Sequence, residues 1–332
     1  MSLGPALRSL IEGAAWRDVM EGETGSRARG LWRRTPLLRL PASGRPELWV
    51  KAEGLQRTGS FKVRGASALL ASLSREETAA GVVTASAGNH GLGVAEAARA
   101  FGVAATVLVP ETSPEVKRRG IAALGAEVVV LGAGYDEAAA RAKELAASTG
   151  RRYLRAFDDE HVIAGNGGTT GAEIAEDLPG GVRAGDLVVV PVGGGGLSSG
   201  IGGSLAATGA TLVGVEPETN HAMYDSFELG EALVDYPQGG PTLAEGLEGA
   251  VSDLTYRLCR EAFEGIVLVS EAAIRTAMAW GYRTAGLVLE ASAAASLATA
   301  LEGGLPPAER VVCVTTGSNV EPDLLDEVLR EA

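Results

Sequence analysis

The sequence predicts an α/β protein with two parallel sheets and helices on both faces of each. Three observations lead to this prediction. Short β-branched runs alternate with alanine-rich stretches at helical spacing, the runs are almost continuously apolar, and glycine-rich or polar turns follow several of them. The alternation indicates a βαβ series. Strands that are apolar on both faces are typical of parallel sheets with helical cover.

The expected elements follow the chain in order. The first series has strands at 81–84, 105–109 and 127–131, followed by helices near 90–101, 114–124 and 135–148. The second has strands at 187–190, 211–215, 265–269 and 310–314, with helical segments between them. The Gly- and Pro-rich connections near 177–186, 236–241 and 302–308 are too short to act as disordered linkers.

Length, charge and cysteine usage limit the possible functions. The chain has 332 residues, a formal net charge of −13 and two cysteines. No apolar run approaches the roughly 18 residues of a membrane helix, and acidity disfavours nucleic acid or an acidic membrane as a partner. The start lacks a secretory pattern, and Cys259 and Cys313 have no C-x-x-C spacing. We therefore expect a cytoplasmic protein with buried thiols.

Lys62 lies in the run TGSFKVRGA (58–66), among small and apolar residues. Such surroundings can desolvate an ammonium group, lower its pKa and free the amine to form a Schiff base with a carbonyl cofactor. The alternative is a solvated surface lysine. Arg57 and Arg64 flank Lys62, and we interpret them as groups that either repel its protonated form or lie solvated on a helix surface.

Four successive glycines, Gly193 to Gly196, follow an apolar strand and precede a helix. Glycines let the backbone approach an anion, and the amides at a helix start point toward it. The run does not fit G-x-G-x-x-G, and no G-K-[ST] sequence occurs, so we expect a site for one phosphate. A tight turn that binds nothing is the alternative. A Schiff-base lysine and a single-phosphate site together predict pyridoxal phosphate as the cofactor.

Four motifs, in this order, resemble the serine/threonine dehydratase family of threonine ammonia-lyase-like enzymes: TGSFKVRGA at 58–66, ASAGNH at 85–90, VGGGGL at 192–197 and VEP at 215–217. That family belongs to the fold-type II pyridoxal phosphate enzymes, which are similar to the tryptophan synthase β-subunit. The resemblance implies a small domain at 52–153 and a large cofactor-binding domain at 1–51 plus 154–332. It also implies a homodimer, and the length of the chain predicts no C-terminal regulatory domain.

The resemblance also implies roles for single residues. Lys62 would hold the cofactor and move the substrate Cα proton, with Phe61 packed against the ring and Asn89 bonded to the 3′ oxygen. Thr316 would face the pyridine nitrogen, and its neutral hydroxyl favours β-elimination. The phosphate would be held by Gly193, Gly194, Gly195, Gly196 and Leu197, and the substrate by Ser86, Gly88, Asn89 and His90.

The expected reaction is β-elimination of a 3-hydroxy amino acid, L-threonine or L-serine, to a 2-oxo acid and ammonia. Several positions depart from the family pattern. Ala87 stands where serine racemases carry a serine, Asn166 where glutamine is usual, Glu245 where aspartate is usual, and residues 289–294 replace E-P-x-G-A. Alternative substrates are therefore 3-hydroxyaspartate, phenylserine and diaminopropionate.

Other outcomes stay open at this point. A β-replacing enzyme or a racemase would keep the same cofactor residues, and a non-catalytic α/β ligand-binding protein would keep only the fold. Glu216 lies where some family members bind a divalent cation, but Asn220 and Ala222 follow it in place of further oxygen ligands. Because a lone carboxylate is a poor site for a hard cation, we expect no metal.

Overall fold

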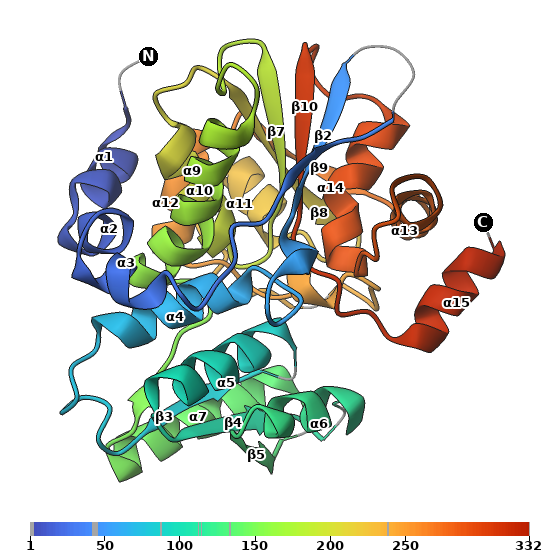
Figure 1. Ribbon diagram of the computed structural model, residues 1–332. Helices are drawn as coiled ribbons and strands as arrows, with labels where there is room; N and C mark the ends of the chain where they lie inside the picture. Colours follow the sequence, from blue (N-terminus) through green and yellow to red (C-terminus); the bar gives the residue numbers. More distant parts are fainter. Residues whose placement is uncertain are drawn as a thin grey trace.

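The computed structural model describes residues 3–41, 46–86, 88–111, 113, 115–132, 134–237 and 239–331. Within these ranges the chain forms two sheets, each covered by helices (Figure 1). The strand order is β1-β2-β10-β7-β8-β9 in the six-stranded sheet and β5-β4-β3-β6 in the four-stranded sheet. The two sheets take their strands from different stretches of the chain, because the whole smaller sheet is inserted between β2 and β7.

The larger sheet contains β1 (Leu37–Arg39), β2 (Glu47–Ala52), β7 (Asp186–Pro191), β8 (Thr211–Pro217), β9 (Gly265–Val269) and β10 (Arg310–Thr315). Its strands pair in parallel, except that β1 runs antiparallel to β2 at the edge. Alternate residues of β7 enter different cores: Val189 packs in one cluster, and Val188 and Val190 in the other. Burial on both faces explains the continuous apolar runs of these strands.

The smaller sheet contains β3 (Val82–Ala85), β4 (Ala105–Val109), β5 (Glu127–Val130) and β6 (Arg152–Tyr153), all parallel. Two clusters again lie on its two faces, one including Val82 and Val107, the other Val83 and Leu108. The two-residue alternation of strand side chains produces this division.

The helices fill the connections between the strands. They are α1 (Pro5–Glu12), α2 (Ala14–Met20), α3 (Glu23–Ala28), α4 (Lys62–Ser72), α5 (Asn89–Phe101), α6 (Glu115–Ala123), α7 (Tyr135–Thr149), α8 (Glu160–Ile163), α9 (Thr169–Asp177), α10 (Gly196–Leu205), α11 (Ala222–Leu229), α12 (Asp253–Ala262), α13 (Glu271–Ala285), α14 (Ala291–Glu302) and α15 (Pro322–Glu331). Short 3-10 turns lie at η1 (Glu53–Leu55) and η3 (Glu245–Leu247), and a π-helical segment, η2 (Ala164–Gly168), joins α8 to α9.

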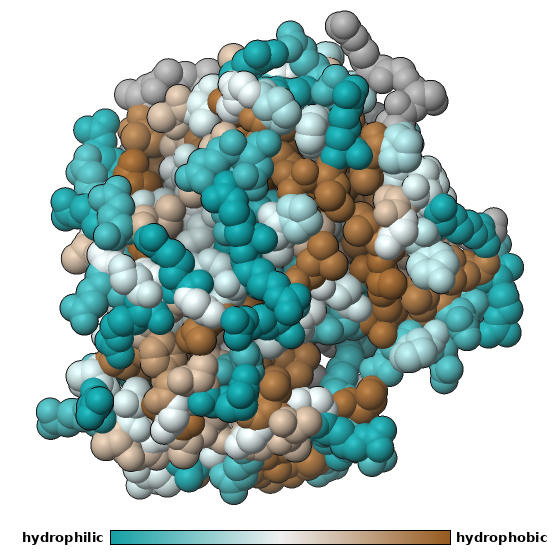
Figure 2. All heavy atoms as spheres, in the orientation of Figure 1, coloured by the Kyte–Doolittle hydropathy of each residue, from teal (hydrophilic) through white to brown (hydrophobic). Residues whose placement is uncertain are grey.

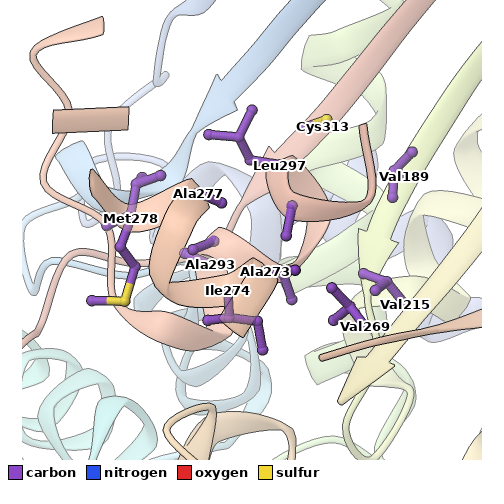
Figure 3. Packing of buried hydrophobic residues seen from close by; sticks show 14 of the residues in the cluster. Val189, Val215, Val269, Ala273, Ile274, Ala277, Met278, Ala293, Leu297 and Cys313 are labelled. Atoms are coloured by element: carbon purple, nitrogen blue, oxygen red, sulfur yellow. The ribbon is translucent and has the colours of Figure 1, made fainter. Parts of the chain in front are cut away.

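Helices α13 and α14 cover one face of the larger sheet. Their small residues, such as Ala277 and Ala293, let both helices pack closely, while Ile274 and Leu297 fill the space toward the strands (Figure 3). The outer surface is mixed: hydrophilic side chains form a band down the centre of the face in Figure 2, with apolar surface beside it. Among the described helices, none combines the length and apolarity that a bilayer crossing requires.

The predicted α/β fold is confirmed, and the seven predicted strands and three predicted helices lie within two residues of the observed ones. Three strands were not predicted. β1 and β6 are only three and two residues long, and β2 contains two charged residues, Glu47 and Lys51. The antiparallel edge strand β1 makes the larger sheet mixed rather than wholly parallel. Cys259 and Cys313 are free and buried, as predicted.

Candidate active site

Two of the predicted turns meet at the carboxyl ends of neighbouring strands, β7 and β10. Gly193–Gly196 follows β7, and Thr316 follows β10. The backbone around Thr316 pairs with the turn before Lys62: the Phe61 amide donates to the Thr316 carbonyl at 3.1 Å, and Ser60 bridges to Gly317. Ligands of open α/β sheets bind at this end of the strands.

Lys62 is the first residue of α4, and its amine lies in desolvated surroundings. The side chain is partly accessible, but Nζ lies 3.4 Å from the Ala156 carbonyl oxygen and 5.1 Å from the centroid of the Phe61 ring. Burial among protein atoms lowers the pKa of Lys62 to about 8, against an opposing attraction from Glu290. The lowered pKa increases the neutral fraction of this amine near physiological pH, as a nucleophile or base requires.

The tetraglycine turn presents bare backbone at the start of α10. Gly195 has a φ of 85° and caps the helix, and no side chain of the described residues bonds to the free amides there. An added Cβ would lie 2.5 Å from the Phe157 ring at Gly194 and 2.7 Å from the Phe157 carbonyl oxygen at Gly196. Glycine is therefore needed for packing on one side, while uncapped amides and the helix dipole suit an anion.

The segment after β3 offers a second helix start. Helix α5 begins at Asn89 behind Gly88, without a side-chain cap from the described residues, and the Gly88 amide donates to Ser86 Oγ at 3.2 Å. An added Cβ at Gly88 would meet no described atom within 4 Å, so the space beside this backbone is open. These amides are placed to receive a carboxylate. Ala87 lies outside the described residues.

The His90 side chain points away from that space. It is 6% exposed, and its Nε2 lies 3.1 Å from Thr84 Oγ1 and 3.4 Å from the Leu154 carbonyl oxygen. Burial, together with repulsion from Lys62, lowers the pKa of His90 to about 3. Any contact of His90 with a substrate must therefore use its backbone rather than its imidazole.

His90 should make the protein sensitive to acid. The unfolded imidazole takes a proton below pH ~6.5 while the folded one stays neutral to about pH 3, so the free energy of unfolding falls as pH drops through this window, by up to about 1.4 kcal/mol per pH unit. His90→Gln removes this contribution and should flatten the dependence. The measurement is urea denaturation at several pH values, and equal slopes in both proteins would contradict the assignment.

The hydroxyl of Thr316 is available. Thr316 is 3% exposed, and its hydroxyl has no hydrogen-bond partner among the described residues, whereas the neighbouring Thr315 hydroxyl donates to the Lys51 carbonyl at 3.0 Å. A hydroxyl without an internal partner can bond to a ligand. The position of Thr316 next to the Lys62 turn fits the predicted ring contact.

Two residues that the sequence did not single out, Glu290 and Asn319, join this site. Asn89 Nδ2 donates to both carboxylate oxygens of Glu290, at 2.8 and 3.0 Å, and Asn319 Nδ2 donates to Asn89 Oδ1 at 2.6 Å. Burial raises the pKa of Glu290 to about 7. The available signals were a lone carboxylate in an apolar run, 289–294, and the asparagine at the end of the polar run TTGSN (315–319) that follows an apolar strand.

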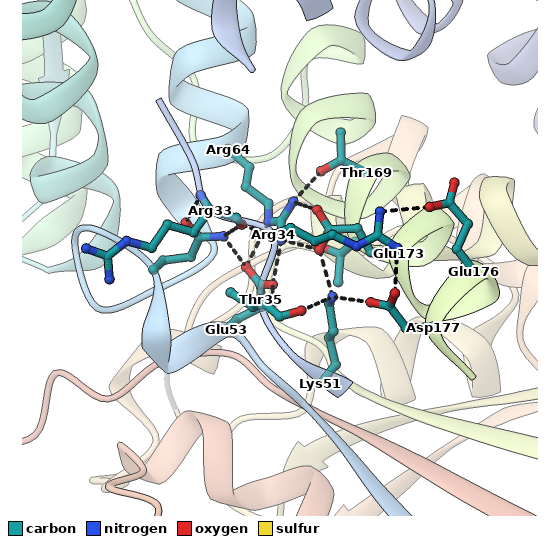
Figure 4. Close-up of polar contacts among 12 residues, drawn as sticks. Arg33, Arg34, Thr35, Lys51, Glu53, Arg64, Thr169, Glu173, Glu176 and Asp177 are labelled. Atoms are coloured by element: carbon teal, nitrogen blue, oxygen red, sulfur yellow. Dashed lines mark hydrogen bonds and ion pairs between the residues drawn. The ribbon is translucent and has the colours of Figure 1, made fainter. Parts of the chain in front are cut away.

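Helix α4 is held by a buried ion network (Figure 4). The Arg64 guanidinium bonds to both oxygens of Glu53 at 2.8 Å and to both oxygens of Glu173 at 2.7 Å. Lys51 Nζ donates to Glu173 and to the Thr35 carbonyl, each at 2.7 Å. The interpretation of Arg64 as a repelling or solvated group is therefore wrong, because two carboxylates neutralise two buried cations. Arg57, in contrast, is exposed, 3.9 Å from Glu96.

The positions that depart from the family pattern have structural partners. Asn166, in the π-helical segment, accepts a hydrogen bond from the Gly65 amide at 2.8 Å and so braces the first turn of α4. Glu245 is exposed and pairs with Lys117 of α6, which connects the two sheet regions. Neither contact shows which substrate the site accepts.

The Glu216 carboxylate bonds to the backbone at the start of a helix. Its two oxygens accept the backbone amides of Met223 and Tyr224 at 3.1 and 2.7 Å, at the start of α11, and burial raises its pKa to about 8. The described part of the chain has no cluster of three or more His, Cys, Asp or Glu side chains that could hold a metal ion.

Fold and site together are those of an α/β protein with a desolvated lysine and two helix starts without side-chain caps, an arrangement that suits a phosphorylated carbonyl compound. The family of pyridoxal-phosphate dependent enzymes matches residues 28–317. The chain belongs to this family, and its fold is that of the fold-type II members. The predicted family and the predicted cofactor, pyridoxal phosphate, are thus confirmed.

Individual relatives are named for one reaction. The chain is 38% identical over 288 residues to an L-threonine ammonia-lyase of Thermotoga maritima, with 86% of this chain and 70% of that protein covered. It is 36% identical over 288 residues to the catabolic L-threonine dehydratase TdcB of Escherichia coli K12, with 85% of each covered. The solved structure of threonine deaminase isoform 2 from Solanum lycopersicum matches with a TM-score of 0.88 at 33% identity, covering 100% of this chain and 90% of that chain.

The residues present fit the cofactor. The uncapped amides of α10 suit its phosphate, the free hydroxyl of Thr316 can meet its ring, and the desolvated Lys62 amine can bind its carbonyl carbon. Because the turn at Gly193–Gly196 consists of glycines, it has no side chain of its own that would block a phosphate from its backbone amides.

Gly194→Ala should weaken pyridoxal phosphate binding by about tenfold or more. The new Cβ would lie 2.5 Å from the Phe157 ring, and relief of such overpacking costs about 1–3 kcal/mol and shifts the turn. The measurement is titration of the cofactor-free chain with pyridoxal phosphate. Gly30→Ala is the control, since its Cβ would meet no described atom within 4 Å. Equal dissociation constants for the two variants would argue against this turn as the phosphate site.

Proposed function

We propose that this chain is an ammonia-lyase that converts L-threonine or L-serine to a 2-oxo acid and ammonia by β-elimination. The observation that carries the proposal is the partly accessible Lys62 amine with its pKa near 8, placed between two uncapped helix starts. One helix start suits a phosphate and the other a carboxylate. The names of the relatives from Thermotoga maritima and Escherichia coli support the reaction class.

Pyridoxal phosphate, when bound, supplies an electron sink that makes the Cα proton of an amino acid acidic. The chain supplies the rest. Gly193–Leu197 hold the phosphate by backbone amides, while Ser86 and the amides at the start of α5 hold the substrate carboxylate. Lys62 takes the Cα proton, because its lowered pKa leaves it partly neutral near pH 7. The hydroxyl of Thr316 stays neutral and does not place a full charge beside the ring, which favours loss of the β-substituent.

The proposal includes the division into domains and the assembly. We assign residues 52–153 to a small domain and residues 1–51 plus 154–332 to a large domain. The four strands of the smaller sheet lie within 52–153, which supports this division, although Ala52 itself ends β2 of the larger sheet. Motion of one part toward the other would exclude water from the reacting substrate. A homodimer is proposed as the assembly, to be measured by light scattering, and the cytoplasm as the location, in keeping with two free thiols.

A substrate panel tests the reaction. Threonine, serine, 3-hydroxyaspartate, phenylserine and diaminopropionate are each incubated with the holoenzyme, and 2-oxo acid and ammonia are both quantified. Threonine and serine should give the two products in equal amounts and the highest kcat/KM. Diaminopropionate would instead yield two ammonia molecules for each 2-oxo acid, and chiral analysis of recovered substrate detects racemisation. A holoenzyme that releases no 2-oxo acid from any of the five would overturn the proposal.

A further inference from the structure

The hydrogen bonds around Asn89 leave only one orientation for its amide. The Thr58 carbonyl oxygen can only accept, so Asn319 must turn its Nδ2 toward it, and that bond is 2.8 Å long. The other hydrogen of the same Nδ2 reaches Asn89 Oδ1 at 2.6 Å. Asn89 Nδ2 is thereby directed to Glu290, whose ionised carboxylate can only accept.

The Asn89 amide group has two hydrogens and uses one of them here. Its Nδ2 lies 2.8 and 3.0 Å from the two oxygens of one carboxylate, a spacing that a single shared hydrogen satisfies. The second hydrogen remains for another acceptor. In the proposed site that acceptor is the 3′ oxygen of the cofactor.

Glu290 is itself fixed in place. Its backbone amide donates to the Gly317 carbonyl at 3.1 Å, and it caps the start of α14. A Cβ at Gly317 would lie 2.3 Å from Glu290 Oε1, so the carboxylate packs directly on the backbone of the turn that carries Thr316. The carboxylate therefore lies between the Asn89 amide and this turn, without room for a different rotamer on that side.

We propose that Glu290 is a positioning residue whose charge controls how Asn89 binds the 3′ oxygen of pyridoxal phosphate. An ionised carboxylate accepts the Asn89 bond with both oxygens. A protonated one keeps a single carbonyl acceptor, so Asn89 donates to one uncharged oxygen in place of a shared, charge-assisted bond. Asn89 is then held less firmly, and its hydrogen bond to the 3′ oxygen weakens. This role rests on the proposed site only through the contact of Asn89 with the cofactor.

The surrounding charges place this change near neutral pH. Burial raises the pKa of Glu290 to about 7, while Asn89 and Lys117 of α6 favour the ionised form. Glu245 of η3 opposes ionisation, and the backbone of Asn319 favours it. Lys62, which lies on α4, and Glu290 attract each other. Loss of a proton from Glu290 thus strengthens the Asn89 bond near neutral pH.

The visible absorbance of the Lys62-bound cofactor reports this change without any substrate. The wild-type holoenzyme is titrated between about pH 5.5 and 8.5, and its band should shift with a midpoint near 7. In Glu290→Gln the same midpoint should be absent, because the amide does not titrate. Glu245→Gln is the matched control: it removes a carboxylate from the same neighbourhood without touching Asn89, and it should keep the midpoint to within about one pH unit.

A second variant covers the case in which Glu290→Gln does not hold the cofactor. Asn319→Asp keeps the size of the side chain but replaces the Nδ2 donor by an oxygen, which cannot donate to the Thr58 carbonyl or to Asn89 Oδ1. It should therefore release the Asn89 amide and shift the visible band of the cofactor at every pH. A Glu290→Gln holoenzyme that titrates like wild type, or an Asn319→Asp holoenzyme with the wild-type spectrum, would overturn the proposed role. A wild-type protein without any cofactor band would instead overturn the cofactor site itself, and this role with it.

Discussion

Lys62→Ala should reduce kcat/KM by at least ~10³-fold while the chain still folds. The substitution removes the group that binds the cofactor covalently and also the base for the Cα proton, and loss of a positioned acid–base group alone costs about 10²–10⁴-fold. The fold should persist, because the Lys62 amine has one hydrogen-bond acceptor, at 3.4 Å. The measurement is 2-oxo acid release together with circular dichroism and the visible cofactor band.

Three further observations make this test specific. Lys143→Ala is the control, since Lys143 lies exposed on α7 and should leave kcat/KM unchanged. Borohydride reduction of the wild-type holoenzyme, followed by peptide mass analysis, should place the cofactor on Lys62. A small primary amine added to Lys62→Ala should restore part of the lost rate, because it can replace the missing base. Full activity in the alanine variant, or the cofactor on another lysine, would contradict the assigned role.

The sequence predicted those parts of the fold in which local pattern and environment agree. Strands such as β4 and β7 are apolar on both faces, and the same residues are favoured by β-propensity and by burial. β2 escaped prediction because its Lys51 is wholly buried, which a pattern of apolar residues cannot foresee. Its ammonium is tolerated there only because Glu173, 122 positions along the chain, neutralises it.

The candidate site could be proposed from the sequence where its residues lie in turns directly after strands. The glycines after β7, the segment after β3 and the threonine after β10 carry their signal locally. Glu290 and Asn319 reach the site through Asn89, from which they are separated by 201 and 230 positions. Contacts over such separations depend on how the two sheets meet, and a single sequence does not show this. The direction of the His90 imidazole, which faces the interior, is likewise not visible in its motif.

The buried ion network beneath Lys62 should give the largest effect on stability. We expect Glu53→Gln to lower the free energy of unfolding by about 3–5 kcal/mol, the typical cost of breaking a buried ion pair from one side. Glu53, Arg64 and Lys51 are each 0% exposed. Although burial by itself opposes ionisation of Glu53, Arg64 holds its pKa below the usual range, so the charge is present in the folded state. Without the charge of Glu53, the two cations Lys51 and Arg64 share one buried carboxylate, that of Glu173.

Urea denaturation, followed by both fluorescence and circular dichroism, measures this loss. Equal m-values for the variant and the wild type would show that both expose a similar surface on unfolding. Glu144→Gln is the matched control: it breaks an exposed pair with Arg141, 2.9 Å apart on α7, and should change stability by no more than about 0.5 kcal/mol. A loss below about 1 kcal/mol in Glu53→Gln would mean that Arg64 finds other partners or water. Because Arg64 lies in the first turn of α4, the substitution should also loosen Lys62, so cofactor affinity should fall together with stability.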